Sequence, residues 1–465
     1  MKRRPLEAVS IIPLTLSLSK GEPVASTIVR ASTKPLILSL SKEARAALLF
    51  IFSVLASAFP LRAAGPLFLE LSAKGQRVDM GLAEFSVEKG EAPDRARLLR
   101  DVVKYDLTFP KLFNLIEGGG ASDKIKPSLS RWSTLGADLL VTGVVDRSFG
   151  SARFTGAVRD VATGDVVLEK TFPLEPGGER ADAHAFADEV LKYFTGQAGV
   201  AQSRIVFVND ATGKKEVCVV DYDGAGFRRI TNDRSIALFP KASPDGKSIV
   251  FTTFKEGRPE IFLLGFDAKS RPLCRYDGLN SAAAWFPDGR ALVATLSLGR
   301  DPSLHVVDLE GRVVRTLTNT AAADTAPSLS PDGLQVAFTS DRPGRPQIYV
   351  MNTSGANMRR LVETDGWCDS PAWSPQGHLV AFTMSEHGRN FDIFTAEVGT
   401  GRLTRLTYGE GDNENAAWSP DGRWLVFASS RRGKFELFVM GADGSLPRPL
   451  GDIPGRSFTP CWMSK

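Results

Sequence analysis

The sequence predicts an all-β six-bladed β-propeller in the C-terminal part, preceded by a smaller N-terminal α/β domain. One line recurs five times, for example as "SLSPDGLQVAFTSDRPG" and "AWSPDGRWLVFASSRRG". A fixed period of this kind indicates an array of identical units. The proline of the line recurs every 43 to 45 residues, at Pro244, Pro287, Pro331, Pro375 and Pro420. Four short strands per unit at this period are typical of propeller blades, each of which stacks on two neighbours.

Each repeat reads as four antiparallel strands joined by three turns. In the Ser-Pro-Asp-Gly turn, proline presets φ and glycine takes the position that needs positive φ. A β run follows, such as Trp424–Ser430, then a basic loop and a second β run, Glu436–Met440. A "DG" turn and a polar strand complete the unit, and this spacing of turns predicts an all-β unit. The aromatic residue before the turn should pack between blades; it is Trp285, Trp373 or Trp418.

The two ends of the propeller segment, residues 200–465, are complementary. The first blade begins at Ser203 without the Ser-Pro-Asp-Gly line, and the chain ends with "FTPCWMSK", residues 458–465, which matches an inner strand. We therefore expect the C-terminal strand to complete the blade that opens at Ser203. Such closure removes a free sheet edge that would otherwise promote aggregation.

Residues 1–64 are expected to be a leader with a secretory signal peptide in 46–64. The apolar run 46–58 follows basic residues and is too short to span a membrane. Small residues then place the cleavage after Ala58 or Ala64. The protein should therefore be exported without membrane insertion.

The charge balance argues against a nucleic-acid partner. Residues 1–64 hold nine Lys or Arg and three Asp or Glu, and the remainder holds 48 and 50. The basic excess therefore lies in the leader. Residues 1–41 also repeat a phrase, "LTLSLSK" and "LILSLSK", which a signal peptide does not need. We expect the true translation start to lie further downstream.

The four cysteines show neither a disulfide pattern nor a metal-binding pattern. Cys218, Cys274, Cys368 and Cys461 are widely separated and lack paired metal spacing. They are expected to be isolated thiols, mostly buried, and no metal or cofactor is predicted.

Residues 65–199 do not share the repeat and should form a small α/β domain with a mixed sheet. The segment 92–107 has apolar residues near helical spacing, and 179–196 is a second helix that ends at Gly196, a C-cap signal. Strands are predicted at 77–85, 137–145, 152–161 and 165–172.

The junction between the two regions carries a family resemblance. The segment "AHAFADEVLKYFTGQAGVAQSRIVFV", Ala183–Val208, leads from a helix directly into the first blade, and lines such as Ser340–Leu361 follow. From Gly65 to Lys465 the chain resembles the TolB family, the periplasmic component of the Tol–Pal system. The resemblance implies a monomeric, non-enzymatic scaffold for outer-membrane integrity and constriction during cell division. The propeller would bind the lipoprotein Pal, and the mature N-terminus would bind TolA.

Two sets of residues follow from this resemblance. The face for Pal should surround one end of the propeller axis and carry Asn280, Asp324, Arg345, Asp369, Arg389, Asn413 and Glu414. The segment Gly65–Gln76 corresponds to the TolA-binding stretch and carries Leu67, Phe68, Leu69, Glu70 and Leu71. The residues alone leave open that this segment is a first strand docked permanently on its own domain.

Two rival functions remain from the residues alone. Propellers of this type also precede prolyl oligopeptidase-like hydrolase domains, but no Gly-x-Ser-x-Gly elbow is present. None of the four histidines has a partner that the sequence reveals; they are His184, His305, His378 and His387. The second rival is a periplasmic binding protein with a metal or sugar on the axis. Its ligands would come from Asp324, Asp369, Asn413 and Glu414, which are otherwise ordinary solvated loop residues.

Overall fold

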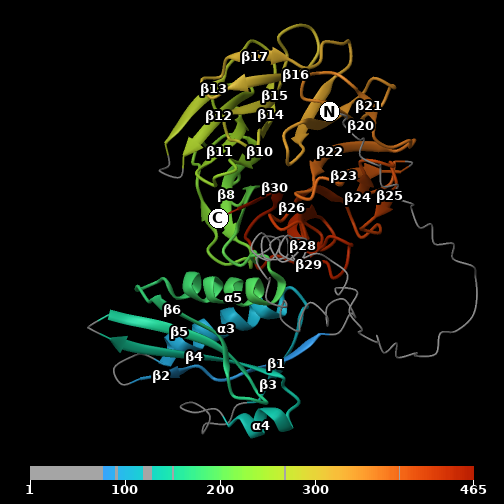
Figure 1. Cartoon of the computed structure of the whole chain (residues 1–465). Coiled ribbons are helices and arrows are strands. Elements are labelled where there is room, and N and C mark those ends of the chain that lie inside the picture. Colours follow the sequence, from blue (N-terminus) through green and yellow to red (C-terminus); the bar gives the residue numbers. More distant parts are fainter. Residues whose placement is uncertain are drawn as a thin grey trace, which may run out of the picture. The chain divides into compact units, whose positions relative to one another are not determined.

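The computed structural model describes residues 77–88, 93–118, 128–148, 151–265, 269–386 and 388–464. These residues lie in a compact unit that spans Pro66–Lys465. They form a six-bladed β-propeller and a smaller N-terminal α/β region, so the predicted fold class is confirmed (Figure 1). The predicted leader and the predicted TolA-binding segment lie outside the described residues.

The N-terminal region is built on a mixed sheet with the strand order β3-β1-β4-β5-β6, and β2 pairs with β4. Strand β1 runs parallel to β3 and β4, whereas β4, β5 and β6 are antiparallel. The strands are β1 (Val78–Leu82), β2 (Ser86–Val87), β3 (Phe113–Glu117), β4 (Leu139–Ser148), β5 (Ser151–Asp160) and β6 (Val166–Pro173). The sequence pattern did not predict β2 or β3.

Both faces of this sheet are covered by helices. Helices α3 (Pro93–Thr108) and α5 (Glu179–Thr195) share an apolar core with β1, β4 and β5. The short helix α4 (Leu129–Thr134) packs Trp132 against Leu140 in a separate cluster. Because adjacent strand residues point to opposite faces, Leu140 and Val141 enter different clusters. Helix α5 ends at Gly196 with φ of 73°, as its C-cap glycine predicts.

The propeller consists of six four-stranded antiparallel sheets. Five of them follow the chain in order from the inner strand outward (Figure 1). Their strands are β10 (Ala237–Ala242), β11 (Ser248–Thr253), β12 (Glu260–Gly265) and β13 (Ser270–Cys274); β14 (Asn280–Trp285), β15 (Ala291–Leu296), β16 (Ser303–Asp308) and β17 (Val313–Thr316); β18 (Asp324–Leu329), β19 (Gln335–Ser340), β20 (Gln347–Asn352) and β21 (Arg359–Arg360); β22 (Trp367–Trp373), β23 (Leu379–Ser385), β24 (Phe391–Glu397) and β25 (Leu403–Arg405); β26 (Asn413–Trp418), β27 (Trp424–Ser429), β28 (Glu436–Gly441) and β29 (Arg448–Pro449).

The blades pack through equivalent positions. A fully buried phenylalanine occupies the same place on the second strand of five blades, at Phe207, Phe251, Phe338, Phe382 and Phe427. The tryptophans before the turns connect blades, as predicted. The indole of Trp418 donates to Ala372 O at 2.9 Å, and that of Trp285 donates to Lys241 O at 3.1 Å.

The sixth sheet joins both ends of the propeller chain in the order β30-β7-β8-β9. It comprises β30 (Ser457–Met463), β7 (Arg204–Asn209), β8 (Glu216–Asp221) and β9 (Arg228–Arg229). Strand β30 is antiparallel to β7, with Phe458 opposite Val208 and Trp462 opposite Ile205. The last strand of the chain therefore supplies the inner strand of the blade that the first propeller strand begins.

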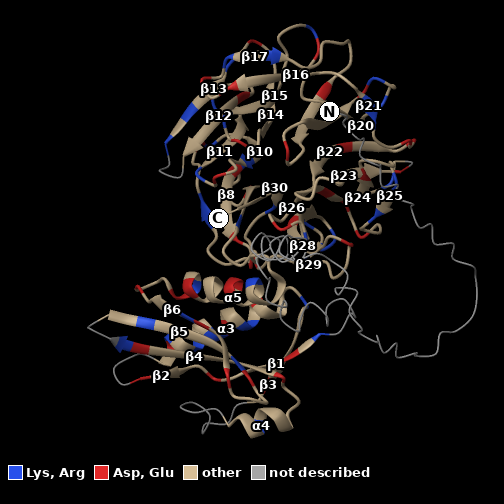
Figure 2. Ribbon diagram, viewed as in Figure 1, with Lys and Arg blue, Asp and Glu red and all other residues tan. Residues whose placement is uncertain are grey.

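Two further sequence expectations can be compared with the structure. Cys218, Cys274 and Cys368 are buried and Cys461 is half-buried, and all four are free thiols. Burial raises the pKa of Cys218, Cys274 and Cys368 to about 12, so none is a reactive thiolate. Within the described ranges, no helix has the length and apolarity needed to cross a bilayer. Basic and acidic residues are interspersed over the ribbon rather than gathered in one band (Figure 2).

The closing strand can be tested with one substitution. Trp462 is 6% exposed, and its indole donates to Ser203 Oγ at 2.7 Å. Trp462→Ala should lower the free energy of unfolding by about 3–5 kcal/mol, because truncation of a buried aromatic leaves a cavity. Trp367→Ala is the control, because Trp367 is 50% exposed and should change stability by less than about 0.5 kcal/mol. Urea unfolding measures both, and equal losses would contradict the closing role of β30.

Candidate axial binding site

All six inner strands carry the same irregularity. In each, the pairing with the second strand shifts register near the start of the inner strand, after its second residue in five blades and after its third in β22. The residue that follows is in the left-handed region in every blade, with φ between 39° and 57°. We call these six residues the axial ring; they are Phe239, Ala282, Ala326, Ser370, Asn415 and Thr459.

The axial ring is held in place by its neighbours. A left-handed conformation costs a non-glycine residue roughly 1–2 kcal/mol, so such a residue persists where the surroundings fix it. In two blades a threonine of the preceding blade accepts a hydrogen bond from the ring backbone. Ala282 N donates to Thr252 Oγ1 at 3.2 Å, and Asn415 N donates to Thr383 Oγ1 at 3.0 Å. At these two positions the bulge couples a blade to the one before it.

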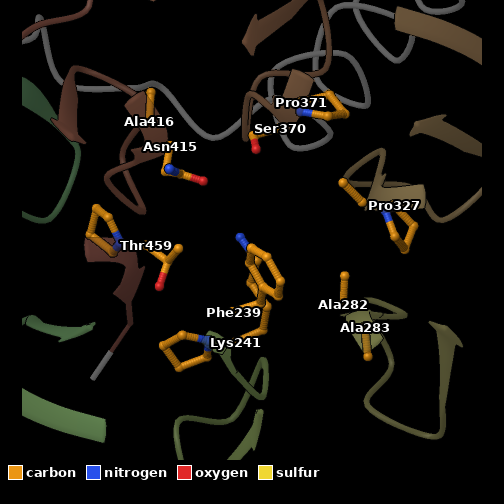
Figure 3. A pocket seen from close by; sticks show the side chains of 13 residues that line it. Phe239, Lys241, Ala282, Ala283, Pro327, Ser370, Pro371, Asn415, Ala416 and Thr459 are labelled. Carbon is orange, nitrogen blue, oxygen red and sulfur yellow. The ribbon is translucent and has the colours of Figure 1, made fainter. Parts of the chain in front are cut away.

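The axial ring surrounds a cavity of about 50 Å³. Figure 3 shows that its walls come from all six inner strands, with the ring of Phe239 and the amide of Asn415 directed into the space. One half of the axial ring is apolar, at Phe239, Ala282 and Ala326, and the other half is polar, at Ser370, Asn415 and Thr459. The hydroxyl of Thr459 is buried and has no hydrogen-bond partner. The ring residues therefore offer polar groups on one side only, and Lys241 adds a charged residue to the lining on the apolar side.

The residues that line the cavity limit the chemistry that it can support. Its lining contains neither a histidine nor a carboxylate, and its one charged residue is Lys241. Its volume is far below the roughly 300–1,000 Å³ of small-molecule sites. No cluster of His, Cys, Asp and Glu suited to a metal ion occurs within the described ranges. The cavity can accept a few water molecules or the tip of a side chain from a partner protein.

Three of the sequence-predicted residues are structural in this fold. Asn280, Asp324 and Asn413 are the first residues of their inner strands and are fully buried. Asn280 donates to Tyr276 O at 2.7 Å, and Asp324 accepts from Arg342 at 2.8 Å. Asn413 donates to Asp392 at 3.1 Å. Their side chains are therefore not open to a partner on this face.

Asp369 and Glu414 occupy equivalent positions of adjacent inner strands, each directly before the axial-ring residue, and are partly exposed. Asp369 accepts from Thr339 Oγ1 at 2.8 Å and from Ser370 N at 2.6 Å. Burial raises the pKa of Asp369, although these hydrogen bonds oppose the rise. Burial, followed by the charges of Asp412 and Asp369, also raises the pKa of Glu414. The structure thus brings together two carboxylates whose ionisation is coupled.

Arg345 and Arg389 lie in loops that join the second and third strands of neighbouring blades. Both are exposed. These loops are at the end of the propeller where the inner strands begin, because Asp324 pairs with Ser340 and Cys368 pairs with Met384. Arg345 donates to Asp365 O in the adjacent loop. The two arginines therefore share an end of the axis with Asp369 and Glu414.

Sequence reasoning missed the axial ring itself. A signal was present, because a proline follows the ring residue in four blades, at Pro240, Pro327, Pro371 and Pro460. Proline inside a strand is found at edges or bulges, since it cannot donate to the ladder. In these four inner strands the proline directly after the ring residue therefore marks the bulge that faces the axis.

Family profiles match both regions of the chain. The "TolB beta propeller domain" matches residues 191–366 and 361–465, and the "TolB amino-terminal domain" matches residues 72–167. The chain belongs to the TolB family. The propeller match alone covers more than half of the sequence. The amino-terminal match precedes the propeller match, as the two regions follow each other in the fold.

Individual relatives agree with this assignment. A "Protein TolB homolog" of Chlorobium chlorochromatii (strain CaD3) is 35% identical over 62% of this chain and 67% of its own length. A "Tol-Pal system protein TolB" of Anaeromyxobacter dehalogenans (strain 2CP-C) is 33% identical over 54% of this chain and 59% of its own length. The chain thus matches between about three fifths and two thirds of these two relatives. The crystal structure of TolB from Acinetobacter baumannii shares the fold, with a TM-score of 0.70, 24% identity, and coverage of 84% of this chain and 97% of that chain.

The coupling between Asp369 and Glu414 gives a testable pKa change. Asp369→Asn should lower the pKa of Glu414, because one of the charges that raise it is removed. The pKa should remain above its ordinary value, since burial is the larger cause. Carbon-detected NMR titration of the Glu414 carboxyl measures the shift. Asp277→Asn, at a fully exposed carboxylate two or more blades away, is the control, and an equal fall in that variant would contradict the coupling.

Proposed function

We propose that this protein is a non-enzymatic periplasmic scaffold of the Tol–Pal envelope system. Its propeller binds the lipoprotein Pal at the end of the axis that carries the axial ring, and its mature N-terminal segment binds TolA. In this role it supports outer-membrane integrity and constriction during cell division. The observation that carries the proposal is the match of both regions to the TolB family, with a relative named as a Tol-Pal system protein.

The geometry of the axial site supports a protein partner over a small ligand. The cavity is small, its lining has no acid–base pair, and its floor is a rigid ring of backbone bulges. Six loops surround it, and loops on a rigid scaffold are where propellers place recognition. A partner that inserts one or two side chains and contacts the loops fits this arrangement. A sugar or a bound metal fits it less well.

The Pal-binding surface is assigned to the exposed members of the sequence-predicted set. These are Arg345, Arg389, Asp369 and Glu414, which share one end of the axis. Asn280, Asp324 and Asn413 keep the inner strands in place beneath that surface. Charge reversal at a buried member would damage the fold, so only the exposed members can test binding.

The combined variant Arg345→Glu, Arg389→Glu and Glu414→Lys should weaken Pal binding at least tenfold. Charges at the rim of an interface steer association and disfavour wrong pairings, and a tenfold change corresponds to about 1.4 kcal/mol. Isothermal titration calorimetry with the soluble domain of Pal measures the affinity. The melting temperature of the variant should match that of the wild type.

Arg402→Glu is the matched control for this variant. Arg402 is an exposed arginine in the turn between β24 and β25, at the opposite end of the blade, where Glu397 pairs with Leu379. It should bind Pal like the wild type. Unchanged affinity in the combined variant together with weakened affinity in Arg402→Glu would move the Pal site to the opposite face.

The proposed TolA-binding stretch can be tested by deletion. Removal of residues 65–71 from the mature protein should abolish TolA binding, because an extended segment can add as a strand to a partner sheet. Pal affinity and the thermal unfolding of the propeller should not change. Co-purification of each partner with the truncated protein gives the readout. Loss of both partners, or failure to fold, would show that the stretch is a structural strand of its own domain.

A further inference from the structure

The N-terminal domain and the first blade meet at a buried polar cluster. Asp106 of α3 is 1% exposed and His184 of α5 is 4% exposed. His184 Nδ1 lies 2.7 Å from Asp106 Oδ2. Tyr222, which follows β8 and is 1% exposed, donates its hydroxyl to the other oxygen of Asp106. One carboxylate thus joins helices α3 and α5 to the propeller. The sequence had shown no partner for His184, since Asp106 is 78 residues away.

A second contact extends the cluster across the same junction. Arg180, one turn before His184 on α5, forms an ion pair with Asp223 of the propeller. His184 Nε2 lies 3.8 Å from Asp223 Oδ2 and 3.5 Å from Arg180 Nη2. With a protonated imidazole, the two carboxylates face two cations. With a neutral imidazole, the cluster holds one buried negative charge without a counter-charge.

Aromatic side chains seal this cluster from water. Phe109 at the end of α3 packs on Trp424 of β27 with ring centroids 4.2 Å apart, and on Tyr222 at 5.0 Å. The guanidinium of Arg448, on β29, lies 4.1 Å from the centroid of Phe109. Low solvent access strengthens electrostatic interactions inside the cluster and makes an unpaired charge costly.

The titratable and charged groups around His184 come from every element that packs there. They are Tyr105 and Asp106 of α3, Arg180 of α5, Tyr222 and Asp223 after β8, Arg448 of β29, and Asp421 and Arg423 of the turn before β27. Figure 2 shows acidic and basic residues in close succession along α5. Among these groups only His184 changes charge near neutral pH by its ordinary pKa.

We propose that His184, Asp106 and Tyr222 form a proton-dependent latch that holds the N-terminal domain against the first blade. The latch is closed when the imidazole is protonated and paired with Asp106. Loss of that proton leaves a buried carboxylate with only neutral donors, so the junction opens more readily. This inference stands on the junction geometry and does not depend on the function proposed above.

The direction of the pH dependence follows from the surroundings of His184. Burial lowers the pKa of His184, but the hydrogen bond that its ring donates to Asp106 and the charges of Asp106 and Asp223 outweigh burial, so the pKa is raised. A histidine with a raised pKa in the closed state stabilises that state fully below its ordinary pKa of about 6.5. The contribution is lost as pH rises through the raised value. Burial also raises the pKa of Asp106. Ionisation of Asp106 therefore also destabilises the closed state as the pH rises.

Hydrogen exchange at the junction measures the latch directly in the full chain. Informative amides are those of Phe109, which bonds to Tyr105 O at 2.9 Å, and Tyr222, which bonds to Ser203 O at 3.2 Å. After correction for the intrinsic pH dependence of exchange, the opening constant should rise with pH, by up to tenfold per unit above about pH 6.5, and level off above the raised pKa. Amides of β19, in a distant blade, should show no such rise.

Two histidine variants separate the latch from a general effect of pH. In His184→Asn the amide replaces ring Nδ1 as a donor to Asp106 but cannot titrate, so the pH dependence at the junction should disappear. His305→Gln is the matched control, because His305 is also buried but bonds to Ser303 and Thr316 within its own blade. It should keep the wild-type pH profile at the junction.

Titration of His184 in the wild-type protein tests the proposed latch even if a variant fails to fold. The imidazole of His184, followed by NMR, should titrate above its ordinary pKa, and Asp106→Asn should move it downward. A His184 that stays neutral through the range, or a junction whose exchange profile is the same in His184→Asn, would overturn the proposal. In that case the imidazole is a neutral bridge between Asp106 and Arg180.

Discussion

Every blade of this protein has two apolar faces, and only a closed ring covers both. The phenylalanines at the centre of five blades are fully buried because a neighbouring sheet lies on each side of them. A break in the ring would expose the apolar faces of the two blades on either side of it. The pairing of β30 with β7 is therefore the interaction on which the other five sheets depend, because it gives the first and last segments of the propeller a common sheet.

Closure also determines what can stand at the axis. Six inner strands converge there, and each one carries a bulge with a left-handed residue. At Ala282 and Asn415 a threonine of the preceding blade accepts a hydrogen bond from the backbone of that residue, so contacts between blades help to fix the axial ring. The side chains of the axial ring are then free to vary. The result is a rigid opening with an apolar half and a polar half, which suits recognition of a protein surface.

The repeat made the propeller predictable, because period and turn chemistry are local properties of the sequence. The burial of three residues of the predicted face did not follow from the sequence. Asn280, Asp324 and Asn413 look like loop residues, but at the first position of an inner strand such side chains bond to backbone and to arginine within the blade. Asp369 and Glu414 lie one residue further along their inner strands. Because successive side chains of a strand point to opposite faces, their side chains point the other way. His184 and Asp106 lie on two helices of the N-terminal domain, 78 residues apart, so their pairing leaves no local pattern in the sequence.

The blade that closes the ring is also the blade that carries the domain junction. Ser203 follows the linker from α5 and accepts a hydrogen bond from Trp462 of the closing strand, while its carbonyl accepts from Tyr222 N. Tyr222 in turn donates to Asp106 of the N-terminal domain. Phe109, Tyr222, Trp424 and Trp462 share one apolar cluster. The closing strand and the junction are therefore connected by two hydrogen bonds through Ser203 and by one packed core, so the sheet that closes the ring is the one on which the proposed latch bears.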